Sequence, residues 1–321
     1  MSNISLMLIF RKLQYDNIMI NNFIYHLRER TLKNLSRLTP FSLSGDLPTT
    51  QKPYHTNMIS CLICTARSSD ILGSLLNDLA QQSLDTNHFE IVLCDNSTAG
   101  HDALLKQYSS RLTIQYLRDT SPYALIGNMK NNLLGLARGE TILFLDDDTR
   151  LPQKNFLEHS LHLIKETGAD IILPRGEGLV STNLSCYNFL DPYSFANRCC
   201  IYQRSLLDSL SGFRQDITAY EDIELGIRAL MTKAKIIQTD QLHYQHPALF
   251  FNSLQKPLAI GQSILRLRRH YPFHIWLMIY VNALMLLPLG LWPTMKNRQW
   301  FKISLGVLLA PFTRERYSYK P

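Results

Sequence analysis

The feature that most constrains the fold is a run of apolar residues that ends in three carboxylates. Residues 141–145 have the composition of a buried strand, and Asp146, Asp147 and Asp148 follow without a break. An unpaired charge costs several kcal/mol in a protein core, so we expect the carboxylates at the C-terminal edge of the strand. Open α/β sheets bind their ligands at that edge. The cluster suits a hard cation such as Mg²⁺, although a solvated acidic turn would have the same sequence.

A second acidic cluster lies at the start of a predicted helix. Glu221 and Asp222 fall in its first turn, where the helix dipole favours negative charge. Helix capping alone would explain such residues, and for Glu224 it is the role that we expect. One carboxylate group suited to a metal and another suited to proton abstraction together indicate metal-assisted group transfer.

The pattern of elements predicts the fold class. Four strand-like segments alternate with four helical ones. The strands are expected at 58–64, 89–94, 141–145 and 170–173, and the helices around 70–82, 101–108, 128–138 and 154–166. This alternation indicates an α/β fold with a single, mostly parallel sheet flanked by helices.

Four blocks, in this order and spacing, resemble glycosyltransferase family 2 with the GT-A fold, from about Met58 to about His246. They are the first strand and its turn at 58–67, the second strand and its polar turn at 90–97, the Asp146–Asp148 run and the Glu221–Asp222 pair. The run matches the DxD motif of the family, and the pair matches the motif that supplies its catalytic base. The resemblance implies a nucleotide-sugar-binding fold.

The resemblance also implies which residues bind the donor nucleotide. Thr65 is expected to contact the base through its backbone, and Asp95 to accept a hydrogen bond from the base, although a turn-forming role would also explain Asp95. Ala66 replaces the aromatic residue that often stacks on the base, so Arg67 could supply a planar group instead. Lys130 stands where the family commonly has an arginine, and it keeps the charge but loses the bidentate fork.

The acidic run and a later histidine are expected to hold the donor phosphates and a divalent cation, Mn²⁺ or Mg²⁺. By resemblance Asp146 faces the ribose, Asp147 belongs with the donor-binding residues, and Asp148 binds the metal. A histidine near 242–247 is a further metal ligand in some GT-A enzymes. In an extended segment His243 and His246 face opposite ways, and His243 is the one that we favour.

The expected reaction is an inverting transfer of a sugar from a nucleoside-diphosphate donor to a hydroxyl. Asp222 is the expected base, and Glu221 orients the acceptor, which is a glycan or lipid-linked molecule of the cell envelope. A nucleotidyltransferase is disfavoured because residues 64–69 contain no glycine. The non-enzyme alternative is a degenerate GT-A domain that acts as a membrane-bound partner protein, and the departures at Ala66 and Lys130 favour it.

The ends of the chain differ from its centre. We expect an N-terminal extension and linker at 1–57, with a helix lying on a surface or a loosely packed segment, the GT-A domain at 58–247, and a basic, apolar segment at 248–321. Apolar runs at 275–293 and 303–312 have basic residues on both sides, and the net charge is +7. This predicts attachment to an anionic membrane on its cytoplasmic face, peripheral, re-entrant or spanning once. A buried core helix is the alternative, and nucleic acid is not an expected partner.

Overall fold

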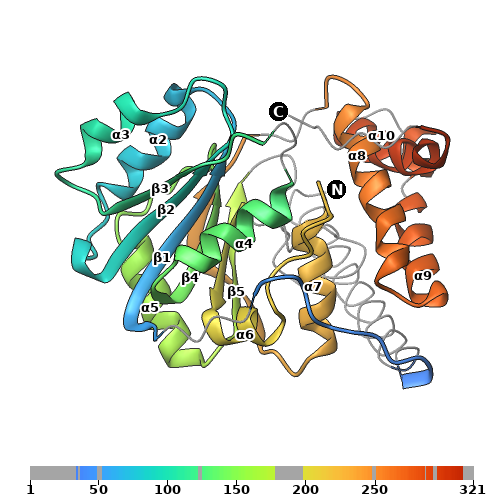
Figure 1. Ribbon diagram of the computed structural model, residues 1–321, viewed down its shortest axis with the longest axis horizontal. Coiled ribbons are helices and arrows are strands. Elements are labelled where there is room, and N and C mark those ends of the chain that lie inside the picture. The colour runs from blue at the N-terminus through green and yellow to red at the C-terminus, as the bar shows by residue number, and fades with distance from the viewer. Residues whose placement is uncertain are drawn as a thin grey trace, which may run out of the picture.

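The computed structural model describes residues 34, 37–48, 53–121, 125–177, 198–247, 251–285, 287–291 and 295–313. Its centre is a seven-stranded sheet with the order β3-β2-β1-β4-β6-β5-β7 (Figure 1). The strands are β1 (His55–Thr65), β2 (Phe89–Asp95), β3 (Ile114–Arg118), β4 (Gly139–Asp146), β5 (Ile171–Glu177), β6 (Cys199–Gln203) and β7 (Ile236–Gln245). Strands β1 to β4 pair in parallel, as do β5 and β7, whereas β6 runs antiparallel to both of its neighbours.

Helices cover both faces of the sheet, which explains why the central strands are apolar without interruption. Side chains alternate along β1, so Ile59, Cys61 and Ile63 pack on one face and Leu62 on the other. The first face is covered by α2 (Ser69–Leu79), α3 (Asp102–Tyr108) and α5 (Phe156–Thr167). The second face is covered by α4 (Ile126–Leu136), α6 (Arg204–Ser209) and α7 (Glu221–Met231).

The predicted α/β class with a mostly parallel sheet is confirmed, and each of the four expected strands and helices is present within a few residues. Of the three other strands, β7 contains His243 from the segment that was treated as extended, whereas β3 and β6 were not predicted. Strand β3 is short and only half buried, so its apolar residues give a weak pattern. Strand β6 contains adjacent cysteines, Cys199 and Cys200, whose burial follows from their central place in the sheet rather than from the local sequence.

The strand register brings the functional segments together. Thr65, the last residue of β1, lies beside Asp95 at the end of β2. On the other side of β1, Cys64 lies beside Asp146 at the end of β4. Because these strands are parallel, their carboxyl ends meet at one edge, where ligands of open α/β sheets bind.

The C-terminal helices form a separate group beside α7 (Figure 1). They are α8 (Gln255–Arg266), α9 (Phe273–Leu284) and α10 (Met295–Leu309), with 3₁₀ turns at Leu267–Arg269, Leu287–Leu291 and Ala310–Phe312. Ile223 and Ile227 of α7 share a core with Ile264 of α8 and Ile275 of α9. Helices α8 and α10 cross closely, since a Cβ on Gly306 would lie 2.3 Å from the carbonyl carbon of Pro257.

Among the described residues, no helix has both the length and the apolarity needed to cross a membrane. The expected N-terminal surface helix falls mostly within residues 1–33, which lie outside the described part of the chain. The boundaries at 57/58 and 247/248 stay predictions.

Candidate active site

The acidic turn after β4 is held by hydrogen bonds to the backbone of Arg198. The Asp146 amide and the Thr149 hydroxyl both donate to the Arg198 carbonyl, at 3.2 and 2.6 Å. The Thr149 amide donates to the Asp146 carbonyl at 3.0 Å and closes the turn. The three carboxylates therefore sit on a fixed loop at the edge of the sheet.

Asp147 points into the protein, so its expected contact with the donor is not supported. One of its oxygens accepts a hydrogen bond from the Thr65 hydroxyl at 2.7 Å, and the other lies 3.4 Å from the Arg67 guanidinium. Burial raises the pKa of Asp147 to about 6, although Arg67 and Thr65 act in the opposite direction. Asp147 therefore links the acidic turn to the end of β1 through its hydrogen bond with the Thr65 side chain.

Asp146, Asp148 and His246 converge on one point. Nε2 of His246 lies 2.9 Å from Oδ1 of Asp148 and 3.4 Å from Oδ2 of Asp146. Oδ1 of Asp148 and Nε2 of His246 are both buried, and they contact each other. Neighbouring ligands of an octahedral cation with bonds of about 2.1 Å lie about 3 Å apart, so the two atoms fit a shared divalent cation.

Charge in this cluster also fits a cation. Burial opposes charge on both side chains, but the neighbouring carboxylates raise the pKa of His246 to about 9, and His246 and Arg67 hold the pKa of Asp148 well below its usual range. A bound metal requires a neutral imidazole and would replace the histidine's proton as the positive charge. The Asp146 side chain is 46% exposed and that of Asp148 only 10%, so Asp146 is the more accessible of the two carboxylates.

The histidine chosen from the sequence, His243, does not lie in this cluster. His243 lies within β7, where its amide donates to the Gln153 side chain at 2.6 Å. His246 follows the strand, and reciprocal hydrogen bonds of 2.8 and 2.9 Å between Gln245 and Arg150 hold that end beside the acidic turn. The available signal was Pro247, which marks the end of the strand and so the edge where ligands bind.

Arg67 and Asp95 are both engaged by groups of the chain itself. The Arg67 guanidinium contacts the Asp148 carboxylate. The buried Asp95 carboxylate accepts hydrogen bonds from the Tyr116 hydroxyl at 2.6 Å and the Ser97 amide at 2.7 Å, and it pairs with Arg118. Burial acts to raise the pKa of Asp95, but these hydrogen bonds outweigh it and lower the pKa. Two of these three donors, Tyr116 and Arg118, come from the unpredicted strand β3.

Lys130 and Glu221 form a buried ion pair, with Nζ 2.5 Å from Oε1. The lysine lies over the rings of Phe144 and Phe213, at 5.7 and 5.3 Å. Burial acts to lower the pKa of Lys130, but Glu221 and Asp222 raise it overall, so the lysine stays charged. Glu221 is buried in this pair, and the adjacent Asp222 is the more accessible of the two carboxylates.

The loop before α7 has an unusual backbone that positions this acidic pair. Tyr220, directly before the helix, has a φ of 83°, a conformation that costs energy for an aromatic residue. Asn131 of α4 holds the same loop through two hydrogen bonds of 2.9 Å to the backbone of Phe213. Gly127 allows α4 to approach closely, because a Cβ there would lie 2.0 Å from the Arg214 carbonyl oxygen.

Two further basic residues near the site were not predicted. Arg198 is buried directly before β6. Lys256 lies in the first turn of α8, and burial lowers its pKa while the charge of Asp146 acts to raise it. The C-terminal helices thus place a basic residue where it affects the electrostatics of the acidic turn. Only the packing of α8 against the domain determines this position.

Comparisons with known proteins agree with this arrangement. Residues 60–179 match the family model described as Glycosyl transferase family 2. Poly(ribitol-phosphate) beta-N-acetylglucosaminyltransferase TarS of Staphylococcus aureus is 28% identical over 121 residues, which are 37% of this chain and 21% of TarS. Poly(ribitol-phosphate) beta-glucosyltransferase of Bacillus spizizenii is 28% identical over 123 residues, 38% of this chain and 19% of that protein. The match therefore covers about a fifth of these relatives.

The similarity to solved structures extends over more of the chain than the sequence matches do. S. aureus TarS 1-349 in complex with UDP-GlcNAc has a TM-score of 0.57 at 18% identity, covering 79% of this chain and 81% of that one. Mannosyltransferase PcManGT of Pyrobaculum calidifontis, in complex with GDP-Man and Mn²⁺, has a TM-score of 0.60 at 14% identity, covering 92% and 95%. These likenesses show that the chain has the GT-A fold, and its residues 60–179 are similar to glycosyl transferase family 2.

Proposed function

We propose that this protein is an inverting, metal-dependent glycosyltransferase that moves a sugar from a nucleoside-diphosphate donor to a hydroxyl acceptor. The observation that carries the proposal is the convergence of Asp146, Asp148 and His246 at the edge of the sheet, where one ligand atom of each lies within 4.8 Å of the others.

The residues divide the chemistry between them. Asp146, Asp148 and His246 would hold the cation, which when bound supplies positive charge to the departing diphosphate. Asp222 accepts the proton of the acceptor hydroxyl as its oxygen bonds to the anomeric carbon and the bond from that carbon to the diphosphate breaks. Glu221, held by Lys130, keeps its carboxylate beside Asp222. Attack opposite the leaving group inverts the anomeric carbon.

The comparisons support a class of donor and acceptor. The similar structures were solved with UDP-GlcNAc or with GDP-Man and Mn²⁺, and the named relatives glycosylate poly(ribitol-phosphate). We therefore propose a UDP- or GDP-sugar as the donor, Mn²⁺ or Mg²⁺ as the cation, and a polymer of the cell envelope as the acceptor.

The proposal is tested by slow donor hydrolysis, which needs no acceptor. Purified protein is incubated with UDP-, GDP- and dTDP-sugars and Mn²⁺ or Mg²⁺, and released nucleoside diphosphate is measured. Release with one donor, abolished by EDTA and restored by excess metal, is the expected result. If no donor is bound or hydrolysed with either metal, the alternative holds, and the domain is a non-catalytic partner protein with a degenerate site.

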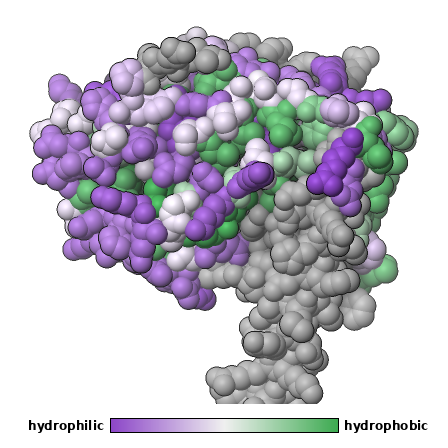
Figure 2. Space-filling view, turned by 90° about the horizontal axis from the view of Figure 1, so that it is seen from below, coloured by the Kyte–Doolittle hydropathy of each residue, from purple (hydrophilic) through white to green (hydrophobic). Residues whose placement is uncertain are grey.

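We also propose that the C-terminal helices attach the protein to an anionic membrane surface on its cytoplasmic side. One face of α9 exposes four apolar side chains at a spacing of four residues, while Ile275 and Ile279 are buried on the other face. These four are Phe273, Leu277, Val281 and Met285, 55%, 39%, 49% and 50% exposed. Figure 2 shows hydrophobic side chains gathered at this end of the molecule.

Basic residues beside the α9 face support an anionic surface. Arg268 and Arg269 are exposed, and the Arg268 guanidinium lies 5.5 Å from the centre of the Phe273 ring. This combination of an apolar stripe and adjacent cations is typical of a helix that lies in the membrane interface. Each such cation adds about 1 kcal/mol near anionic lipid.

Replacing Leu277 and Val281 with glutamate is expected to abolish sedimentation with phosphatidylglycerol vesicles, because it places two charges on the apolar face. Sedimentation of the parent protein should weaken with salt and on phosphatidylcholine vesicles. A matched control replaces Ile71 and Leu136, which are similarly exposed but lie on α2 and α4. If the control loses as much binding, or if the parent does not sediment with the vesicles, this face of α9 is not a membrane contact.

A further inference from the structure

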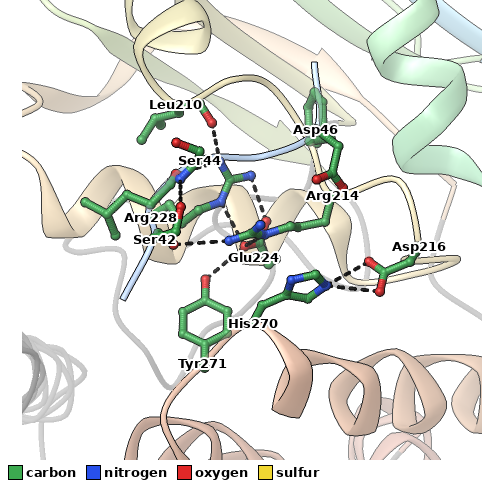
Figure 3. Close-up of polar contacts among 12 residues, drawn as sticks. Ser42, Ser44, Asp46, Leu210, Arg214, Asp216, Glu224, Arg228, His270 and Tyr271 are labelled. Atoms are coloured by element: carbon green, nitrogen blue, oxygen red, sulfur yellow. Dashed lines mark hydrogen bonds and ion pairs between the residues drawn. The ribbon is translucent and has the colours of Figure 1, made fainter. Parts of the chain in front are cut away.

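A buried ionic network surrounds Glu224 of α7 (Figure 3). Its centre is Glu224, which is fully buried. Nε and Nη2 of Arg228 each donate to its carboxylate at 2.8 Å, the Tyr271 hydroxyl donates at 2.9 Å, and Nε of Arg214 lies 3.5 Å away. Glu224 is therefore not the helix cap that the sequence indicates.

The network joins three parts of the chain that are distant in sequence. Arg228 also donates to the carbonyls of Leu43, Leu210 and Gly212, at 3.1, 2.7 and 2.7 Å. Arg214 donates to the Ser42 carbonyl at 3.1 Å. The linker before β1 and the loop before α7 are thus both fastened to the helix that carries Glu221 and Asp222.

The C-terminal helices complete the same structure. Tyr271 lies between the 3₁₀ turn and α9, and the neighbouring His270 pairs with Asp216 of the loop at 3.0 Å. Arg266 of α8 donates to the Asp216 carbonyl at 3.1 Å and to the Thr218 hydroxyl at 3.0 Å. The segment that leads into the strained Tyr220 is therefore held on one side by the C-terminal helices and on the other by Arg214.

Stability alone does not explain this arrangement. Burying two guanidinium groups and a carboxylate is costly, and apolar residues of similar volume often stabilise a core as well or better. The ionic network instead fixes orientation, because the planar guanidinium of Arg228 holds both the helix and the loop carbonyls in one geometry. Because Glu224 lies one turn after Glu221 and Asp222, the network controls the position of these two carboxylates.

We propose that Glu224 is a positioning residue for the acidic pair and that Tyr271 makes this positioning depend on the docked C-terminal helices. The proposal rests on the proposed glycosyl transfer. Glu224 holds α7 so that Glu221 meets Lys130 and Asp222 faces the acceptor. The Tyr271 hydroxyl is the contact through which displacement of α8 and α9 reaches the site.

The test removes one hydroxyl. Tyr271→Phe deletes the contact with Glu224 and keeps the ring. Tyr108→Phe is the matched control, because its buried tyrosine also donates one hydrogen bond, to the Gly73 carbonyl at 3.1 Å, on the opposite face of the sheet. We expect the kcat for transfer by Tyr271→Phe to fall roughly tenfold, with an altered pH profile of kcat and an unchanged Kd for nucleoside diphosphate with metal. Tyr108→Phe should keep the parental kcat and pH profile.

A second measurement does not depend on turnover. Amide hydrogen exchange over residues 216–224 should be faster in Tyr271→Phe than in the parent or in Tyr108→Phe. Parental kcat and parental exchange in Tyr271→Phe, or equal losses in both variants, would overturn the positioning role while the proposed function stands. A parent protein that turns over no donor would overturn the function instead, and exchange alone would then decide the coupling. Glu224→Gln should show a larger loss of kcat, and if it fails to fold, Tyr271→Phe still decides.

Discussion

Asp148→Asn is expected to abolish donor hydrolysis and sugar transfer, because it removes the charged oxygen that lies 2.9 Å from Nε2 of His246. Nucleotide binding should lose its dependence on Mn²⁺ or Mg²⁺ at the same time. The thermal midpoint should fall while the fold persists, since His246 and Arg67, which hold the pKa of Asp148 below its usual range, lose their charged partner. Calorimetry with UDP or GDP, with and without metal, measures the binding, and product release measures turnover.

The control for this variant is Asp102→Asn, which removes an exposed carboxylate from the first turn of α3. It should keep turnover and metal-dependent binding. Asp148→Asn protein that binds nucleotide and metal as tightly as the parent would show that Asp148 is not a metal ligand. His246→Ala should then be examined against His243→Ala, of which only the former is expected to weaken metal-dependent binding.

Asp222→Asn is expected to lower the rate of transfer by roughly 10²–10⁴-fold, the usual contribution of a general base. Binding of donor and metal should persist, because Asp222 does not belong to the cluster of Asp146, Asp148 and His246. Initial rates of acceptor-dependent transfer give the loss, and nucleotide calorimetry gives the binding. The fold should persist, since Asp222 is more accessible than its neighbours on α7.

Glu221→Gln provides the contrast on the adjacent residue. It leaves Lys130 charged and buried without its partner at 2.5 Å, and breaking such a pair costs about 3–5 kcal/mol. We therefore expect a marked fall in thermal stability for Glu221→Gln and little for Asp222→Asn. Retention of more than about a tenth of the parental rate by Asp222→Asn would move the role of the base to Glu221 or another group.

The sequence by itself determined the layered sheet and the edge at which the acidic turn lies. The apolar run of β4 cannot continue into three carboxylates within a core. Its parallel neighbours end at the same edge because parallel strands run in the same direction. Helix α7 was recognisable from its period and its acidic first turn. These properties depend on a few consecutive residues, which is why they could be predicted.

The tertiary structure alone decided which side chains meet. Local pattern sets the face on which a residue lies but not the distant groups that approach that face. The pairing of Gln245 with Arg150 therefore determined that His246, and not His243, joins the acidic turn. Contact with Thr65 turned Asp147 inward. Glu224 acquired its partners only when the linker, the loop before α7 and the C-terminal helices packed around it, since hydrogen bonds between such distant segments have no counterpart in the local sequence.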